Sequence, residues 1–86
     1  MKKIALTQHA KMKLAILARH GFKVTEDEIK DVILGPDRLL EGYKGRKVAQ
    51  KRFGPEHVLR VVYEELGDEI RVITVYPGRR ERYEYE

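Results

Sequence analysis

The chain has no cysteine, tryptophan, serine or asparagine among its 86 residues. The absence of cysteine excludes disulfide bonds, zinc sites built on thiolates and thiol nucleophiles. No apolar run approaches the roughly 18 residues that a membrane-spanning helix needs, and residues 1–6 lack the apolar stretch of a signal peptide. We therefore expect a cytoplasmic protein that makes no membrane contact, whose chemistry has to use arginine, lysine, histidine and tyrosine side chains.

The chain is also short and unusually rich in charge. A mass of 10.1 kDa suits one hydrophobic core, so we predict a single domain over residues 1–86. Charged residues make up 37% of the chain, against about 25% in an ordinary globular protein. Abundant glutamate, lysine and arginine without asparagine or cysteine is typical of heat-adapted proteins, so part of this charge can serve stability.

The positive charge is concentrated in segments, although the net charge is only +4. Residues 1–23 contain six lysines or arginines and no acidic residue, and residues 42–63 contain six against one. A basic surface attracts polyanions through counterion release, and nucleic acid is the commonest partner of a small basic domain. The alternative is a heat-adapted surface of ion pairs, and charge alone does not decide between the two.

Two helices are expected in the first half of the chain. Thr7 is well placed as the N-cap of a helix over residues 8–20. Thr25 and Glu28 have the spacing of a capping box, which predicts a second helix over residues 26–34. A glycine follows each predicted helix, as expected for a helix end.

After these helices the apolar period changes from 3.6 to 2, which indicates strands. Together with a short first strand, the chain predicts an α+β domain of order β-α-α-β-β-β(-β), in which two N-terminal helices pack on an antiparallel sheet. The expected strands cover residues 1–6, 38–41, 46–53, 58–65 and 69–76.

The last two predicted strands are joined by Gly67 and Asp68, a two-residue hairpin signal. This turn fixes the register of the hairpin. The resulting pairs are Glu64 with Arg71, Val62 with Ile73, and Arg60 with Val75. In this register Tyr63 and Tyr76 share the face of Leu59, where we expect them to pack in the core.

Basic side chains are expected to converge near the end of the last strands. Arg60 comes from mid-strand, Lys51 or Arg52 from the strand before it, and Arg79, Arg80 and Arg82 follow the final strand. Cleaving a phosphodiester bond without a metal needs such cations around the transition state, together with groups that move protons. The structural alternatives are a solvated basic tail and, for Arg60, an edge arginine paired with a glutamate.

These residues carry a family resemblance. The run Leu59-Arg60-Val61-Val62-Tyr63, followed by Ile73-Thr74-Val75 and Gly78-Arg79-Arg80-Glu81-Arg82-Tyr83, resembles the C-terminal half of the RelE/ParE-like toxins of toxin–antitoxin systems, and is similar to the BrnT-type toxins. The opening Thr7-x-His9-Ala10, with Pro36-Asp37 and Gly45-Arg46, resembles a small prokaryotic domain family grouped with them. RelE-like members cut RNA, often mRNA on the ribosome, without metal, whereas ParE-like members act on DNA gyrase.

The resemblance implies roles for individual residues. Arg60 matches a strand arginine that contacts phosphate, and Arg80 matches the arginine that stabilises the transition state. Arg82 matches a second arginine of that motif, with Arg79 beside it. The family's proton-transferring tyrosine lies a few residues past the arginines. Tyr83 comes one or two positions early and Tyr85 lies closer to that spacing, so either residue, or neither, fills the role. On the preceding strand Lys51 and Arg52 are the expected RNA contacts.

The first predicted helix adds two further candidates. His9 lies in its first turn, where it could serve as general base or phosphate ligand, or simply pack as a histidine bonded to the backbone. Lys13 occupies the position at which the uncharacterised family carries an arginine. Three dispersed histidines make no plausible zinc site, so we expect neither a metal nor another cofactor.

Two functions follow as hypotheses. The first is a toxin-like endoribonuclease that cleaves RNA by attack of the 2′-hydroxyl on the adjacent phosphate, and the resemblance implies an antitoxin as its protein partner. The second is a non-catalytic basic module that binds RNA, DNA or a partner protein, as a ParE-like inhibitor does. The oligomeric state, including a homodimer, is left open by the sequence.

Overall fold

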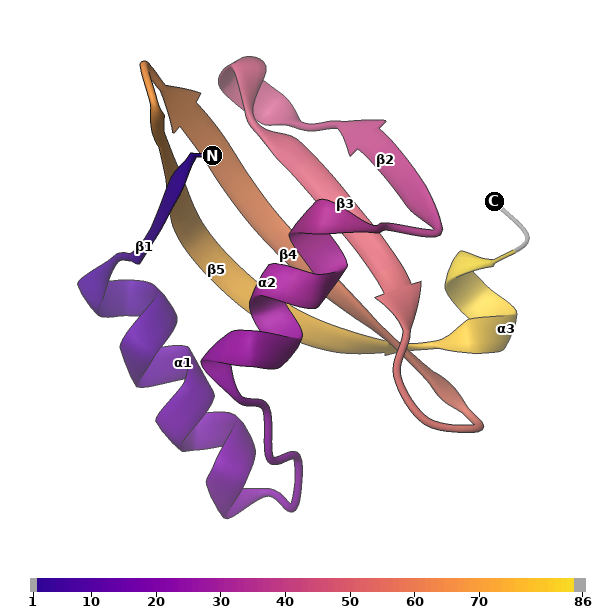
Figure 1. The fold of residues 1–86 in the computed structure, drawn as a ribbon. Coiled ribbons are helices and arrows are strands. Elements are labelled where there is room, and N and C mark those ends of the chain that lie inside the picture. Colours follow the sequence, from indigo (N-terminus) through magenta and orange to yellow (C-terminus); the bar gives the residue numbers. More distant parts are fainter. Residues whose placement is uncertain (1, 85–86) are drawn as a thin grey trace.

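The computed structural model of the chain describes residues 2–84, which form a five-stranded sheet with two helices on one face and a short third helix beyond the last strand (Figure 1). The fold is α+β, as predicted. The elements in chain order are β1 (Lys3–Leu6), α1 (Gln8–Arg19), α2 (Glu26–Leu34), β2 (Arg38–Glu41), the 3₁₀ turn η1 (Tyr43–Gly45), β3 (Lys47–Arg52), β4 (His57–Leu66), β5 (Glu69–Arg79) and α3 (Arg80–Tyr83).

Both N-terminal helices begin at the predicted caps. The Thr7 hydroxyl accepts a hydrogen bond from the Ala10 amide at the start of α1. At the start of α2 the Glu28 amide donates to the Thr25 hydroxyl, and the Thr25 amide donates to the Glu28 carboxylate, which completes the capping box. These bonds satisfy backbone donors that have no partner inside the helix, so the sequence signal is strong at these positions.

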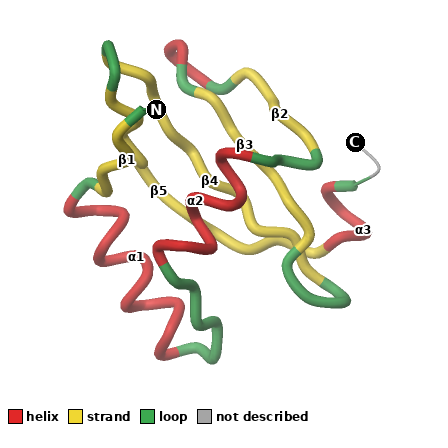
Figure 2. Tube along the Cα trace, viewed as in Figure 1, coloured by secondary structure: helices red, strands yellow, loops and turns green. Residues whose placement is uncertain are grey.

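The sheet has the order β1-β5-β4-β3-β2 and is mixed (Figure 2). β1 pairs in parallel with β5, whereas the remaining neighbours are antiparallel. The predicted all-antiparallel sheet is therefore wrong at β1. The reason is the connection: after β1 the chain runs through two helices and three strands before β5 returns beside it, and such a long crossover allows a parallel neighbour.

The β4–β5 hairpin contains a bulge that the sequence did not predict. Glu64 lies opposite Arg71 as expected, but Ile73 is an extra residue on β5. The Ile73 carbonyl accepts a hydrogen bond from the Thr7 hydroxyl, 3.2 Å away. Beyond the bulge the pairing moves by one residue, so Arg60 lies opposite Tyr76 instead of Val75, and Val62 opposite Thr74 instead of Ile73.

The core lies between the sheet and the helices α1 and α2. Leu59, Val61 and Val75 from the central strands are fully buried there against Ile29 of α2. Tyr63 belongs to this core as predicted, and its burial raises the pKa of its hydroxyl. Tyr76 does not, because the bulge turns the far half of β5 over and brings Val75 inward in its place.

Within residues 2–84 no helix is long and apolar enough to cross a membrane.

Candidate functional site

A row of four side chains crosses the sheet on the face opposite α1 and α2. Residues at paired positions of neighbouring strands point to the same side of a sheet. Pairing places Arg38 of β2 beside Gln50, Gln50 beside Arg60, and Arg60 beside Tyr76 of β5. We call these four residues the cross-strand row. Gln50 and Arg60 are buried in it, with exposures of 1% and 8%.

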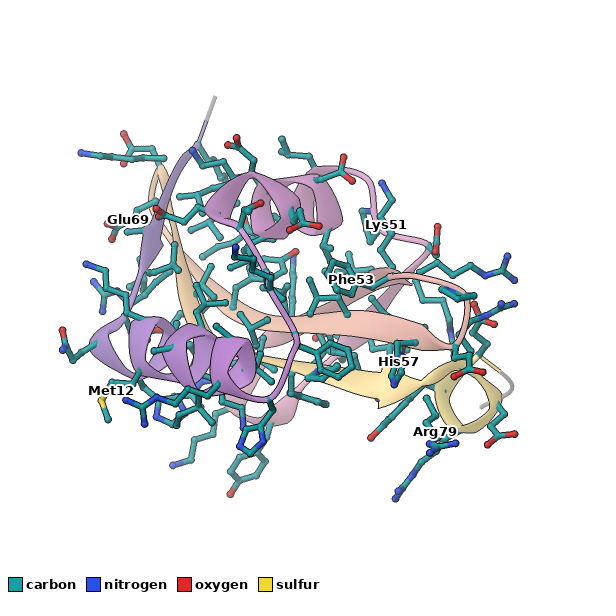
Figure 3. All side chains as sticks on the ribbon, turned by 90° about the horizontal axis from the view of Figure 1, so that it is seen from below. Met12, Lys51, Phe53, His57, Glu69 and Arg79 are labelled. Atoms are coloured by element: carbon teal, nitrogen blue, oxygen red, sulfur yellow. The ribbon has the colours of Figure 1, made fainter. Side chains whose placement is uncertain are left out.

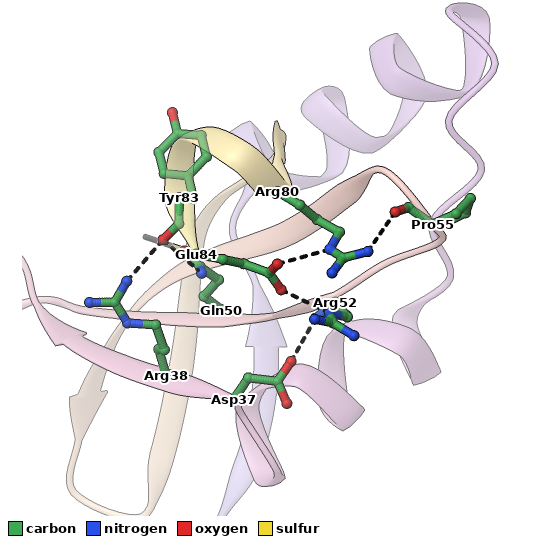
Figure 4. Close-up of polar contacts among 8 residues, drawn as sticks. All are labelled: Asp37, Arg38, Gln50, Arg52, Pro55, Arg80, Tyr83 and Glu84. Atoms are coloured by element: carbon green, nitrogen blue, oxygen red, sulfur yellow. Dashed lines mark hydrogen bonds and ion pairs between the residues drawn. The ribbon is translucent and has the colours of Figure 1, made fainter. Parts of the chain in front are cut away.

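Helix α3 covers the cross-strand row with Tyr83. The Arg60 guanidinium carbon lies 4.3 Å from the centre of the Tyr83 ring and 5.8 Å from that of Tyr76. The Tyr83 carbonyl accepts hydrogen bonds from Arg38 Nη1 at 2.9 Å and Gln50 Nε2 at 3.4 Å (Figure 4). A buried guanidinium is costly, and the electron-rich faces of two aromatic rings offset part of that cost.

Gly78 provides the floor on which Tyr83 lies. A Cβ atom at this position would overlap the Tyr83 ring. The absence of a side chain on this residue of β5 therefore allows the ring to lie directly on the strand and to reach Arg60. The chain turns into α3 only two residues later, so Gly78 and Tyr83 together set where the helix is held.

Glu84, immediately after α3, bridges two arginines. Its Oε2 accepts a bond from Arg52 Nε at 2.9 Å, and its Oε1 accepts one from Arg80 Nε at 2.8 Å (Figure 4). The bond from Arg52 makes the larger contribution and the bond from Arg80 the next in holding the pKa of the Glu84 carboxyl below its usual value. We call Glu84, Arg52 and Arg80 the arginine bridge.

Both arginines of the bridge are anchored by further bonds. Arg80 Nη1 donates to the Pro55 carbonyl at 2.7 Å, in the turn between β3 and β4. The Arg52 amide donates to the Asp37 carboxylate at 2.9 Å, which fixes the end of β3. The two cations thus belong to different elements, α3 and β3, and each is positioned partly by groups other than Glu84.

An open pocket of about 270 Å³ adjoins the arginine bridge. Arg79 and Arg80 contribute to its wall, together with acidic side chains and the β3–β4 turn. Arg79 itself is largely exposed, with Glu81 as a distant ion-pair partner at 4.0 Å. Arg82 is exposed as well, and its guanidinium carbon lies 5.8 Å from the centre of the Tyr83 ring. The pocket is open to solvent beside Arg80.

Lys51 does not join this site, although it was expected to. It pairs with Leu59 and therefore points to the opposite face, where its ammonium group bonds Asp31 of α2 at 2.9 Å. Figure 3 shows Lys51 beside α2 and Arg79 on the other side of the sheet, near α3. Successive side chains of a strand point to opposite faces of the sheet. Of the two candidates on β3, therefore, only Arg52 lies on the face of the site.

The candidates on the first helix are also remote from the site. His9 is exposed and Lys13 is partly exposed on α1. Helices α1 and α3 lie at opposite sides of the molecule in the two perpendicular views of Figures 1 and 3. The structure therefore brings together Arg52, Arg60, Arg80 and Tyr83, with Arg79 and Arg82 at the margin. Tyr85 lies outside the described residues.

Three polar residues of the site were missed at the level of sequence. Arg38 and Gln50 reach the site because of the register in which β2 pairs with β3. No turn signal in the sequence fixes that register. Glu84 could have been found, because it lies four residues after Arg80, the spacing of a helical ion pair. Gln50 Oε1 is buried and has no hydrogen-bond partner within residues 2–84.

Chemically, the site can bind an anion and stack an aromatic base. Guanidinium groups bind phosphate through paired N–H donors, and the Tyr83 ring offers an aromatic surface beside them. Comparisons of the chain with protein-family models, with curated proteins and with solved structures found no match.

Proposed function

We propose that this protein is a metal-independent endoribonuclease of the RelE-like kind, acting as the toxin of a toxin–antitoxin pair. The observation that carries the proposal is the convergence of three arginines with Tyr83 on one face of the sheet. Arg52 and Arg80 meet at one carboxylate, and Arg60 lies beneath the Tyr83 ring. A cluster of fixed guanidinium groups suits a reaction in which a phosphoryl group gains negative charge.

In the proposed reaction the 2′-oxygen of one nucleotide forms a bond to the adjacent phosphorus, and the bond from phosphorus to the 5′-oxygen breaks. The products are a 2′,3′-cyclic phosphate and a free 5′-hydroxyl. The 2′-hydroxyl loses its proton to a water molecule, and the 5′-oxygen gains a proton. Arg80 stabilises the charge on the phosphoryl oxygens, and Tyr83, one of the two tyrosines that the resemblance assigns to proton transfer, donates the proton to the 5′-oxygen.

The test is cleavage of RNA by the purified protein in the presence of a chelator. Wild type should produce fragments with 2′,3′-cyclic phosphate ends. Arg80→Ala should lower the rate by about 100-fold or more, the usual effect of removing one transition-state donor. Arg71→Ala is the matched control, because Arg71 is an exposed arginine at the other end of β5. Equal rates for the two variants would overturn the proposal.

A second function is favoured by one observation. Arg60 exposes only 8% of its surface under Tyr83, so RNA cannot reach its guanidinium while α3 stays in place. A non-catalytic module that binds RNA, DNA or a protein through the outer arginines needs no such movement. It predicts binding that weakens as salt rises, without strand cleavage. Absence of nucleic-acid binding at low salt would leave a protein partner, as for the ParE-like inhibitors.

A further inference from the structure

Glu84 occupies the position at which the site could receive a phosphate. Its two carboxylate oxygens each accept one arginine Nε–H, at 2.9 and 2.8 Å. The Glu84 side chain is only 18% exposed, whereas that of Arg52 is 60% exposed. The carboxylate therefore lies inside the arginine pair, with the outer side of Arg52 open to solvent.

A phosphate group makes the same demands on its surroundings as this carboxylate. Both are anions whose oxygens accept charge-assisted bonds from guanidinium groups. The bond from Arg80 to Pro55 fixes the Arg80 guanidinium, and the bond from the Arg52 amide to Asp37 fixes the backbone at Arg52. Neither bond involves Glu84. An anion-binding pair of arginines would remain.

We infer that Arg52 and Arg80 form a phosphate subsite and that Glu84 is its intramolecular occupant, displaced by a phosphate of the RNA backbone. This inference rests on the proposed function for the identity of the ligand. The low pKa of Glu84 means that the occupant is ionised and competes at neutral pH.

The experiment compares Glu84→Gln with Glu81→Gln. Both variants remove one negative charge from the same short segment, but Glu81 is 79% exposed and lies outside the arginine bridge. The first probe is a fluorescently labelled single-stranded DNA oligonucleotide of mixed sequence, which lacks the attacking hydroxyl and reports binding alone by fluorescence anisotropy. The second is inorganic phosphate, followed through the ¹⁵N–¹H signals of the arginine Nε groups.

Glu84→Gln should bind both probes about three- to tenfold more tightly than wild type, the range expected when one partly exposed ion pair no longer competes. Glu81→Gln should change the affinity less than about twofold, because general charge is screened. Tighter binding by Glu84→Gln supports the subsite whether or not the protein cleaves RNA. Equal affinities for the two variants would overturn it, even if wild type proves to be a ribonuclease.

A second variant controls for the possibility that Glu84→Gln changes the affinity by unfolding α3. Glu84→Asp keeps the charge but is one methylene shorter, so it cannot hold both arginines at the observed distances. Its affinity should lie between those of wild type and Glu84→Gln. Backbone amide signals of residues 80–84 show whether the helix is retained in each variant. An affinity equal to that of wild type for Glu84→Asp, with the helix intact, would also contradict the inference.

Discussion

Two glutamates at opposite ends of the sheet each bridge a pair of cations, yet the two bridges differ in what they join. Glu65 at the end of β4 binds Lys2, just before β1, and Lys47 of β3, the latter at 3.0 Å. Glu84 binds Arg52 and Arg80 and so ties α3 to β3. The lysine bridge, formed by Glu65, Lys2 and Lys47, joins strands of the finished sheet, whereas the arginine bridge holds a four-residue helix across a cluster of cations.

The difference in cation also matters. An ammonium group is a compact charge without a fixed plane, whereas a guanidinium presents a planar set of donors that matches phosphate. A stabilising ion pair can use either group, and the lysine bridge needs nothing more. Arginine on both sides of Glu84 suits a pair that also binds an oxyanion, as we propose. The two bridges thus separate charge that supports the fold from charge that we assign to function.

The largest expected effect comes from exchanging the cations. Arg80→Lys should slow RNA cleavage about 100-fold, since one ammonium cannot replace the two donors that guanidinium directs. Lys47→Arg, the reverse exchange in the lysine bridge, should leave the rate unchanged. Cleavage rates under single-turnover conditions provide the measurement. Similar losses in both variants would mean that the bridges do not differ in the way described.

A second prediction releases α3 from the sheet without substituting a residue of either bridge. The methyl group added in Gly78→Ala would overlap the Tyr83 ring. Overpacking of this kind costs about 1–3 kcal/mol, so the substitution should release the helix. Amide signals of residues 80–84 should move toward unstructured positions, while those of Val61 in the core stay in place.

The matched control is Gly35→Ala, where an added Cβ would meet its nearest neighbours at ordinary distances of 3.8 and 3.9 Å. It should leave the amide signals of α3 unchanged. Retention of α3 in Gly78→Ala, or an equal disturbance of the core signals, would contradict the role given to Gly78.

The smallest effect concerns pH. The hydrogen bond from Lys2, followed in size of effect by that from Lys47, lowers the pKa of Glu65 below its ordinary value of 4.5. A carboxyl with a lowered pKa in the folded protein contributes stability that is complete above 4.5 and disappears as pH falls through the lowered value. The melting temperature of Glu65→Gln should therefore lie slightly below that of wild type near pH 7, and the gap should close in acid.

Glu84→Gln should show the same pH dependence with a smaller gap, because its bridge holds only a peripheral helix. Thermal unfolding followed by circular dichroism at several pH values provides both curves. A gap that does not change with pH would show that the carboxylate charge is not its source.

Local signals in the sequence predicted more than long-range ones. The caps at Thr7 and Thr25 act over three residues, and both helices begin where they indicate. The Gly67-Asp68 turn fixed Glu64 opposite Arg71 correctly, but it could not reveal the bulge at Ile73, where the backbone bonds Thr7 from the far end of the chain. The partner of Arg60 was consequently wrong by one residue.

The site was predicted in composition but not in arrangement. Arg60, Arg80, Tyr83 and Arg52 were candidates, and the structure brings them together. Lys51 was misplaced because the face of a strand residue depends on register, which is set by partners distant in sequence. Glu84 was not among the candidates, although its distance of four residues from Arg80 suits a helical ion pair.

The position of β1 at the edge of the sheet, beside β5 alone, has a consequence for the order in which the protein can be made. Lys3 pairs with Glu69, so β1 has no partner in the sheet until β5, the last strand of the sheet in chain order, has been synthesised. Until then its apolar residues Ile4 and Leu6 stay uncovered, while α1 and α2 can form from local contacts. Closure of the sheet is therefore a late event in biosynthesis, and an unfinished chain is exposed to chaperones and proteases at its N-terminal strand.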